Sequence, residues 1–155
     1  MKRMTKEKMV GESWKVIDTS KREFSESFRK GYELYKKGNL PKYTANLVLF
    51  YAVECGLKAI LLSQQHVYMF SKLCKDYREY GHDIKKLLKH FGIESRFELK
   101  CFCTKLGQQV QPYQYHEVWR YGVEYDARDM EKIQKIENNL DEIAKWIEQN
   151  NGRHW

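Results

Sequence analysis

The hydrophobic and polar positions of this chain follow helical spacing over most of its length. The most apolar segment is 45–62, ANLVLFYAVECGLKAILL, and its polar interruptions are Asn46, Glu54 and Lys58. Four-residue steps place these residues along one stripe of a helix. A helix that is otherwise apolar all round predicts a central position in a bundle. Glu54 and Lys58 then either pair with each other or face a cleft.

Helical spacing predicts further elements before and after this segment. We expect a first helix from residue 13 or residue 20 to residue 37, and the apolar helix itself from residue 42 to residue 64. An aromatic and basic stretch follows at 67–80. Asp83, in Gly81-His82-Asp83, is then placed to cap the start of a short helix.

The second half of the chain predicts two more helices. Apolar positions within 97–110 recur at helical spacing and indicate a helix that Pro112 breaks. Residues 113–125 are rich in aromatic side chains and are expected to form an irregular connector. The last helix is expected over 126–150, and no segment alternates convincingly with the period of a strand.

The composition agrees with a helical domain. Hydrophobic residues make up 42% of the chain and there are only two prolines, so a core of ordinary size can form around long helices. The fold class expected is all-α: an up-and-down bundle of four main helices plus one short helix. We expect a single domain at 13–150, between a flexible N-terminus at 1–12 and a tail at 151–155.

Other classes of protein are not indicated. Charged residues interrupt the longest apolar run and no apolar run follows the basic N-terminal residues, so the chain is expected to be cytoplasmic, with no membrane partner. The two cysteines at 101 and 103 are too isolated for a zinc site, and reduced thiols are the expectation for all four cysteines. We expect no metal and no cofactor.

The net charge of +7 is unevenly distributed. Residues 124–148 are acidic, so the positive charge lies on the rest of the chain. A basic body suits RNA or a nucleotide, and it suits a partner of complementary charge equally well; a merely solvated surface is the plain alternative. The stretch 67–80 interleaves aromatic and basic side chains, as single-stranded nucleic-acid surfaces and dimer interfaces both do.

Two segments of the chain together resemble a known family. AVECGLKAILL at 52–62, followed by GHDIKKLL at 81–88, is similar to the central helix and the next helix start of HEPN-domain proteins, and the resemblance extends over about 20–148. It implies a HEPN-like helical bundle that forms homodimers. Members either cleave RNA without a metal ion or bind a nucleotide, RNA or a nucleotidyltransferase-like partner subunit, often in bacterial stress or defence systems of the toxin–antitoxin kind.

The ribonucleases of this family carry an arginine, four to six further residues and then a histidine, and this chain lacks that motif. Arg78 precedes His82 by one residue too few, and His116 stands four residues before Arg120, in the reverse order. The expected function is therefore non-catalytic binding of a nucleotide, an RNA or a partner protein. The alternatives are a divergent ribonuclease that uses His116 with Arg120, or Arg78 with His82, and a pure protein–protein interaction module.

The candidate binding residues are Lys58, His82, Arg120 and Tyr121. Arg120 lies between Trp119 and Tyr121 and could stack on a base or hold a phosphate; the alternative is a link to a carboxylate such as Glu54. Lys58 either meets a phosphate in a cleft or, as we favour, forms a structural ion pair with Glu54. His82 at a helix start could contact an anion or orient a loop.

Overall fold

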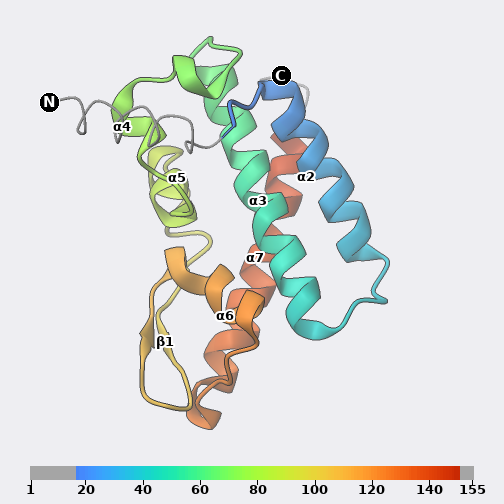
Figure 1. The fold of residues 1–155 in the computed structure, drawn as a ribbon, viewed down its shortest axis with the longest axis vertical. Coiled ribbons are helices and arrows are strands. Elements are labelled where there is room, and N and C mark those ends of the chain that lie inside the picture. Colours follow the sequence, from blue (N-terminus) through green and yellow to red (C-terminus); the bar gives the residue numbers. More distant parts are fainter. Residues whose placement is uncertain (1–16, 151–155) are drawn as a thin grey trace, which may run out of the picture.

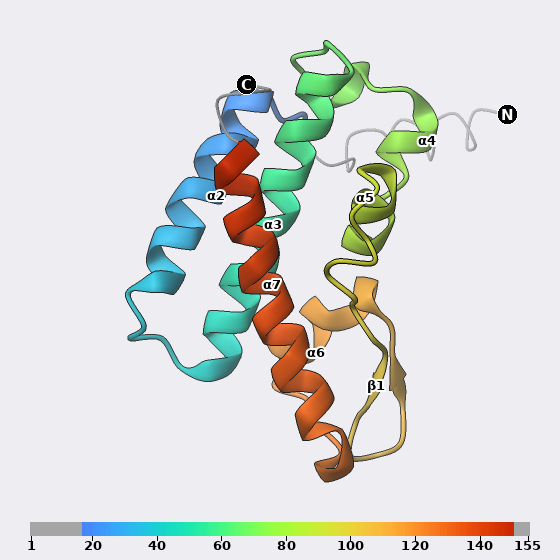
Figure 2. The same ribbon diagram turned by 180° about the vertical axis from the view of Figure 1, so that it is seen from behind.

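The computed structural model describes residues 17–150, which form a mainly helical fold (Figure 1). Its long helices are α2 (Lys21–Lys36), α3 (Lys42–Gln64) and α7 (Met130–Asn150). α3 runs antiparallel to α2 and packs against both α2 and α7. Figure 2 shows the same arrangement from behind, with α7 lying along α3.

The shorter elements lie between α3 and α7 in the sequence. They are η1 (Phe70–Lys72), α4 (Lys75–Arg78), α5 (Ile84–His90), β1 (Phe102–Cys103), β2 (Gln109–Val110), η2 (Pro112–Gln114), α6 (Tyr115–Tyr121) and η3 (Ala127–Asp129). α5 and α6 both pack against α3, so three separate parts of the chain meet there. In Figure 1 the hairpin of β1 and β2 lies on the same side of the molecule as α5 and α6.

The helix boundaries follow from local capping chemistry. Ser20 and Glu23 form a capping box at the start of α2, in which each side chain accepts a hydrogen bond from the other residue's backbone N–H. Asp83 accepts from the backbone N–H of Lys86 and caps α5, as predicted. The predicted bounds of α3 are confirmed. The expected flexible N-terminus, the start at residue 13 and the tail at 151–155 lie outside the described residues.

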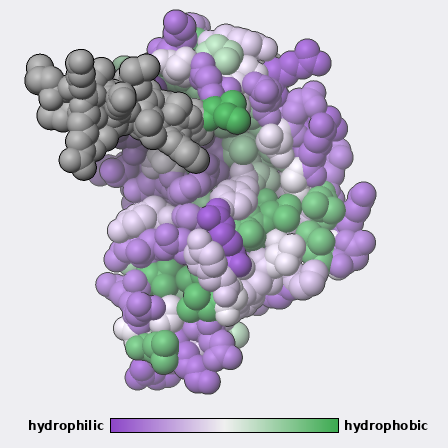
Figure 3. Space-filling model, viewed as in Figure 1, coloured by the Kyte–Doolittle hydropathy of each residue, from purple (hydrophilic) through white to green (hydrophobic). Residues whose placement is uncertain are grey.

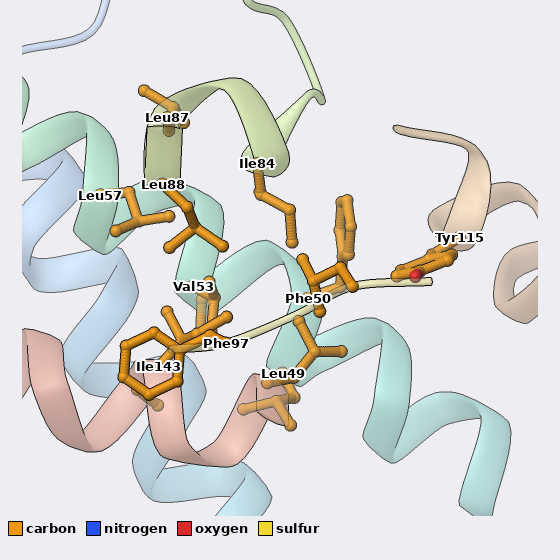
Figure 4. Packing of buried hydrophobic residues seen from close by; sticks show 14 of the residues in the cluster. Leu49, Phe50, Val53, Leu57, Ile84, Leu87, Leu88, Phe97, Tyr115 and Ile143 are labelled. Atoms are coloured by element: carbon orange, nitrogen blue, oxygen red, sulfur yellow. The ribbon is translucent and has the colours of Figure 1, made fainter. Parts of the chain in front are cut away.

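A single hydrophobic core surrounds α3. Leu49, Phe50, Val53 and Leu57 of this helix are fully buried, and side chains from α5, α6 and α7 point toward them (Figure 4). The burial of α3 on nearly all sides explains why its sequence shows no polar face.

α3 is long and apolar enough to cross a membrane by length and composition alone. In this fold, however, its apolar side chains lie inside the core, and the face shown in Figure 3 is mostly hydrophilic with smaller hydrophobic areas. α3 therefore occupies the position of the core helix of a globular domain.

Two polar residues near the start of α3 find a partner on α7. Asn46 donates a hydrogen bond to the buried Glu137 of α7, and Lys42 Nζ lies 3.0 Å from Glu137 Oε1. Within the polar stripe, Asn46 is thus paired with α7, whereas Glu54 and Lys58 pair with each other inside α3.

The predicted helix over 97–110 is wrong. The chain instead forms an antiparallel hairpin, in which Phe102 pairs with Val110 and Cys103 with Gln109. Leu106 would lie on the apolar face of a helix, but it is 90% exposed near the tip of the hairpin. Gly107 has a positive φ of 86°, a conformation that lets the chain reverse here and that a helix excludes.

The predicted irregular connector over 113–125 is wrong for residues 113–121, which are helical. Pro112 occupies the first position of η2, where a missing N–H costs no hydrogen bond, and η2 leads directly into α6. Pro112 therefore begins a helical segment rather than ending one. This matters for the site, because α6 carries both His116 and Arg120.

Replacing Gly56 with alanine tests how tightly α3 and α7 pack. An added Cβ would lie 2.8 Å from Cγ2 of Ile147 and 2.9 Å from a ring carbon of Phe28, both buried. Overpacking of this kind costs roughly 1–3 kcal/mol, against a gain of up to about 1 kcal/mol in helix propensity. We expect Gly56→Ala to lower the free energy of unfolding by about 1–2 kcal/mol in urea titrations. Ser27→Ala, at an exposed position of α2, is the control, and a stabilised Gly56→Ala protein would contradict the packing.

Candidate functional site

The site is built around the carboxylate of Glu54, which lies inside the apolar helix α3. Its Oε2 is 2.9 Å from Lys58 Nζ, one turn along the helix, and its Oε1 is 2.7 Å from His82 Nδ1. The Glu54 side chain is only 10% exposed. Both carboxylate oxygens therefore have charge-assisted partners, which is what a buried carboxylate requires.

Lys58 is enclosed by this pairing and by aromatic rings. Its Nζ lies 5.4 Å from the ring centre of Phe70 and 6.0 Å from that of Phe24, and the side chain is 11% exposed. An ammonium held by a carboxylate and two ring faces is stabilised where it is. Lys58 thus forms the ion pair with Glu54 and does not line the pocket described below.

Two histidines from distant parts of the chain meet beside Glu54. His82 precedes α5 and His116 lies on α6, and their ring centres are 4.2 Å apart. Tyr51 of α3 lies next to both, with its ring centre 6.1 Å from each imidazole. Because α5 and α6 both pack on α3, this helix fixes the position of each member of the group.

His116 is the buried member of the pair. Only 7% of it is exposed, and its Nδ1 has no hydrogen-bond partner among residues 17–150. His82, by contrast, has 47% of its side chain exposed while its Nδ1 is held by Glu54. One imidazole is therefore anchored and open to solvent, and the other is buried.

These surroundings move the pKa values of the two histidines in opposite directions. The hydrogen bond that His82 donates to Glu54 raises the pKa of His82 above its ordinary 6.5, against the opposing effect of burial. Burial lowers the pKa of His116, and the nearby charge of His82 lowers it further. At pH 6.5, between the two pKa values, the favoured state is a protonated His82 beside a neutral His116.

Glu54 stays ionised in this arrangement. Burial by itself raises the pKa of its carboxyl, but the hydrogen bond with His82 and the charge of Lys58 outweigh burial and leave the pKa below its ordinary value. A permanent negative charge at Glu54 is what keeps His82 protonated and fixes the orientation of its ring.

Arg120 lies on α6 one turn after His116. Its guanidinium contacts the Tyr51 hydroxyl and lies 5.7 Å from the Tyr51 ring centre, so its partner is Tyr51 and not Glu54. Arg120 is exposed, which leaves its other donors free for a ligand. The helical form of α6 places His116 and Arg120 on one face. The alternative prediction of a ribonuclease that uses these two residues requires this arrangement.

A pocket of about 470 Å³ opens over the two histidines. Besides His82 and His116 it is lined by side chains from α5, α6 and the segments before them: Glu79, Tyr80, Asp83, Lys86, Tyr113, Gln114 and Glu117. The remaining sequence candidates lie elsewhere. Tyr121 lines a separate pocket of about 340 Å³ beside the hairpin. Arg120 of α6 and Arg78 at the end of α4 are both exposed and line neither pocket.

Sequence reasoning named His82, His116 and Arg120 but did not bring them together. It also missed Tyr51, which contacts all three, and Tyr113, which lines the pocket. The spacing of Tyr51 and Glu54 on the apolar helix, three residues apart, was a signal that both point to the same neighbours.

No protein-family model, curated protein or solved structure matches this chain. The resemblance to HEPN domains therefore stays a prediction, and the functional argument that follows starts from the geometry of the site.

A pair of variants tests whether Glu54 and Lys58 stabilise the fold as a unit. Glu54→Gln leaves the buried Lys58 charge without its partner, and we expect a loss of about 3–5 kcal/mol in the free energy of unfolding. The double variant Glu54→Gln, Lys58→Met removes both charges, and we expect it to recover a large part of that loss. Urea unfolding of the three proteins measures this, and a double variant less stable than Glu54→Gln would contradict the pairing.

Proposed function

We propose that this protein is a metal-independent ribonuclease in which His82 and His116 are the general acid and the general base. The observation that carries the proposal is the contact of two imidazoles whose pKa values are shifted in opposite directions. Pairs of titratable groups pushed apart in this way are typical of acid–base catalysis, since one member is ready to give a proton and the other to accept one.

The reaction that suits such a pair is attack of a ribose 2′-hydroxyl on the adjacent phosphodiester. Neutral His116 takes the proton of the 2′-hydroxyl, and the 2′-oxygen forms a bond to phosphorus. Protonated His82 gives its proton to the 5′-oxygen, whose bond to phosphorus breaks. The products are a 2′,3′-cyclic phosphate and a free 5′-hydroxyl. Each histidine ends in the state in which the other began, and proton exchange with solvent restores both.

The contacts of His82 define its part in this reaction. Glu54 occupies its Nδ1, so Nε2 is the nitrogen that can donate to a leaving group. Glu54 itself does not touch the substrate; it orients the ring and stabilises its charge, and is therefore a positioning residue. With ring centres 4.2 Å apart there is no room for a phosphate between the imidazoles, so the scissile phosphate lies across their pocket-facing edges.

Arg120 supplies charge stabilisation in this proposal. A pentacoordinate phosphorus carries more negative charge on its oxygens than the starting diester, and a guanidinium near that point lowers the barrier. Arg120 stands one turn from His116, outside the residues that line the pocket, and is exposed, with Tyr51 holding its position; in this proposal its guanidinium reaches the phosphate from the rim. The order His116 then Arg120 reverses that of the HEPN ribonuclease motif.

The proposal extends to family and context through the sequence resemblance alone. The mainly helical fold is compatible with a HEPN-like up-and-down bundle that forms homodimers. A bacterial stress or defence module, with a nucleotidyltransferase-like subunit as a possible partner, is the setting that the resemblance implies.

Non-catalytic binding of RNA or a nucleotide is the second candidate function. It is favoured by the close contact of the two imidazoles, which confines a phosphate to one edge of the pair. In that case protonated His82 and Arg120 hold a phosphate by charge, and His116 serves only as a wall of the pocket.

A cleavage assay with histidine variants tests the proposal. Unstructured RNA is incubated in EDTA with wild type, His82→Ala or His116→Ala, and the products are analysed for 2′,3′-cyclic phosphate. We expect each variant to lose about 10²–10⁴-fold in kcat/KM, the usual contribution of a general acid or base. The control is His66→Asn, which removes an exposed histidine outside the site. Cleavage unaffected by both variants would reject this site, and no cleavage by the folded wild type would favour the binding role.

The dependence of kcat/KM on pH tests the assignment of the two roles. We expect a bell-shaped profile around pH 6.5, because His116 must lose its proton at a pKa below 6.5 and His82 must keep its proton up to a pKa above 6.5. Residual activity of His116→Gln should lack the acidic limb, and that of His82→Gln should lack the alkaline limb. The opposite pattern would exchange the two roles.

A further inference from the structure

The pocket over the histidines has an aromatic wall. Tyr80 and Tyr113 both line it, from segments far apart in the sequence. Tyr113 is 48% exposed, so much of its side chain is open to solvent. It belongs to η2, whose first residue is the buried Pro112, and it lies three residues before His116. Tyr80 is braced by Tyr77 at 5.9 Å between ring centres. A ring held in place as Tyr80 is stacks on a ligand at little cost in conformational entropy.

The charges around the pocket are divided. Glu79, Asp83 and Glu117 line it, against Lys86 and the protonated His82. Asp83 follows His82 directly and its carboxylate accepts from the backbone N–H of Lys86, so a phosphate held by His82 and Lys86 also meets the repulsion of Asp83. The two tyrosines suit an uncharged part of the ligand, such as a base.

The depth of His116 limits which nucleic acid can reach it. Since His116 is only 7% exposed, a 2′-hydroxyl meets it only if the nucleotide enters the pocket. In a duplex the bases are paired and stacked, so the nucleotide would first have to be extruded at a cost of a few kcal/mol. A single strand can turn one base outward at much lower cost.

From these observations we infer that the ligand is single-stranded RNA and that one unstacked base of it binds in the pocket against Tyr113, with Tyr80 on the same wall. This inference rests on the proposed function, because it takes the phosphate beside His82 as the reacting one. Tyr113 is a specificity-determining residue in this arrangement. Stacking accepts any base, so the selection is for an unpaired strand rather than for a sequence.

Binding of a non-cleavable strand tests the inference independently of catalysis. The probe is a fluorescent RNA decamer with 2′-fluoro groups, which lack the attacking hydroxyl, used alone and annealed to its complement. Fluorescence anisotropy is measured with wild type, Tyr113→Ala, Tyr113→Gln and Tyr113→Phe. The matched control is Tyr68→Ala, which removes a tyrosine of similar exposure that does not line the pocket.

We expect the single strand to bind at least 10-fold more tightly than the duplex. Tyr113→Ala and Tyr113→Gln should each weaken binding by about 5- to 150-fold, the range of one lost base–aromatic stack, whereas Tyr113→Phe and Tyr68→Ala should not. Two non-aromatic variants are used so that a folding defect in one does not decide the result. Equal affinity for the duplex, unchanged affinity in both variants, or no binding of the single strand overturns the inference.

Cleavage of the unmodified decamer, measured in parallel, separates this inference from the proposed function. Tyr113-dependent binding without cleavage rejects the ribonuclease and supports the single-stranded ligand. Two outcomes would support the ribonuclease but overturn the role of Tyr113. One is cleavage of the duplex as fast as of the single strand, and the other is an unchanged cleavage rate in both Tyr113→Ala and Tyr113→Gln.

Discussion

The site depends on one buried negative charge. Glu54 interrupts the most apolar helix of the chain, and a carboxylate in such a place must be fully paired or it destabilises the fold. Lys58 satisfies one oxygen from within α3, but the second oxygen needs a partner from another element. His82 is that partner, at 2.7 Å, and the segment before α5 is thereby tied to the centre of the molecule.

The chemistry of the site follows from the same pairing. Holding His82 protonated places a positive charge 4.2 Å, ring centre to ring centre, from the buried His116, and a second proton there is doubly unfavourable. A structural need, the pairing of Glu54, thus produces an electrostatic difference between two adjacent imidazoles. Glu54 is for this reason both a stabilising residue and a positioning residue, and its loss affects stability as well as the charge of His82.

The sequence predicted those parts of the structure that local rules decide. The bounds of α3 and the Asp83 cap follow from apolar composition and capping chemistry, which act within a few residues. The hairpin was mistaken for a helix because Phe102, Leu106 and Val110 happen to recur at four-residue spacing. Gly107 with its positive φ was the contrary signal, and the pairing of Phe102 with Val110 is a tertiary fact that periodicity does not contain.

For the candidate site, too, the sequence predicted only what lies within one helix. The stepwise spacing of Glu54 and Lys58, and of His116 and Arg120, is visible in the sequence because each pair lies on one helix. The contact of His82 with His116 depends instead on α5 and α6 both packing on α3, and nothing within either segment encodes it. An isolated histidine in a sequence is therefore a weak sign of catalysis. Two histidines from separate segments become informative once both segments are known to pack on the helix that carries Glu54.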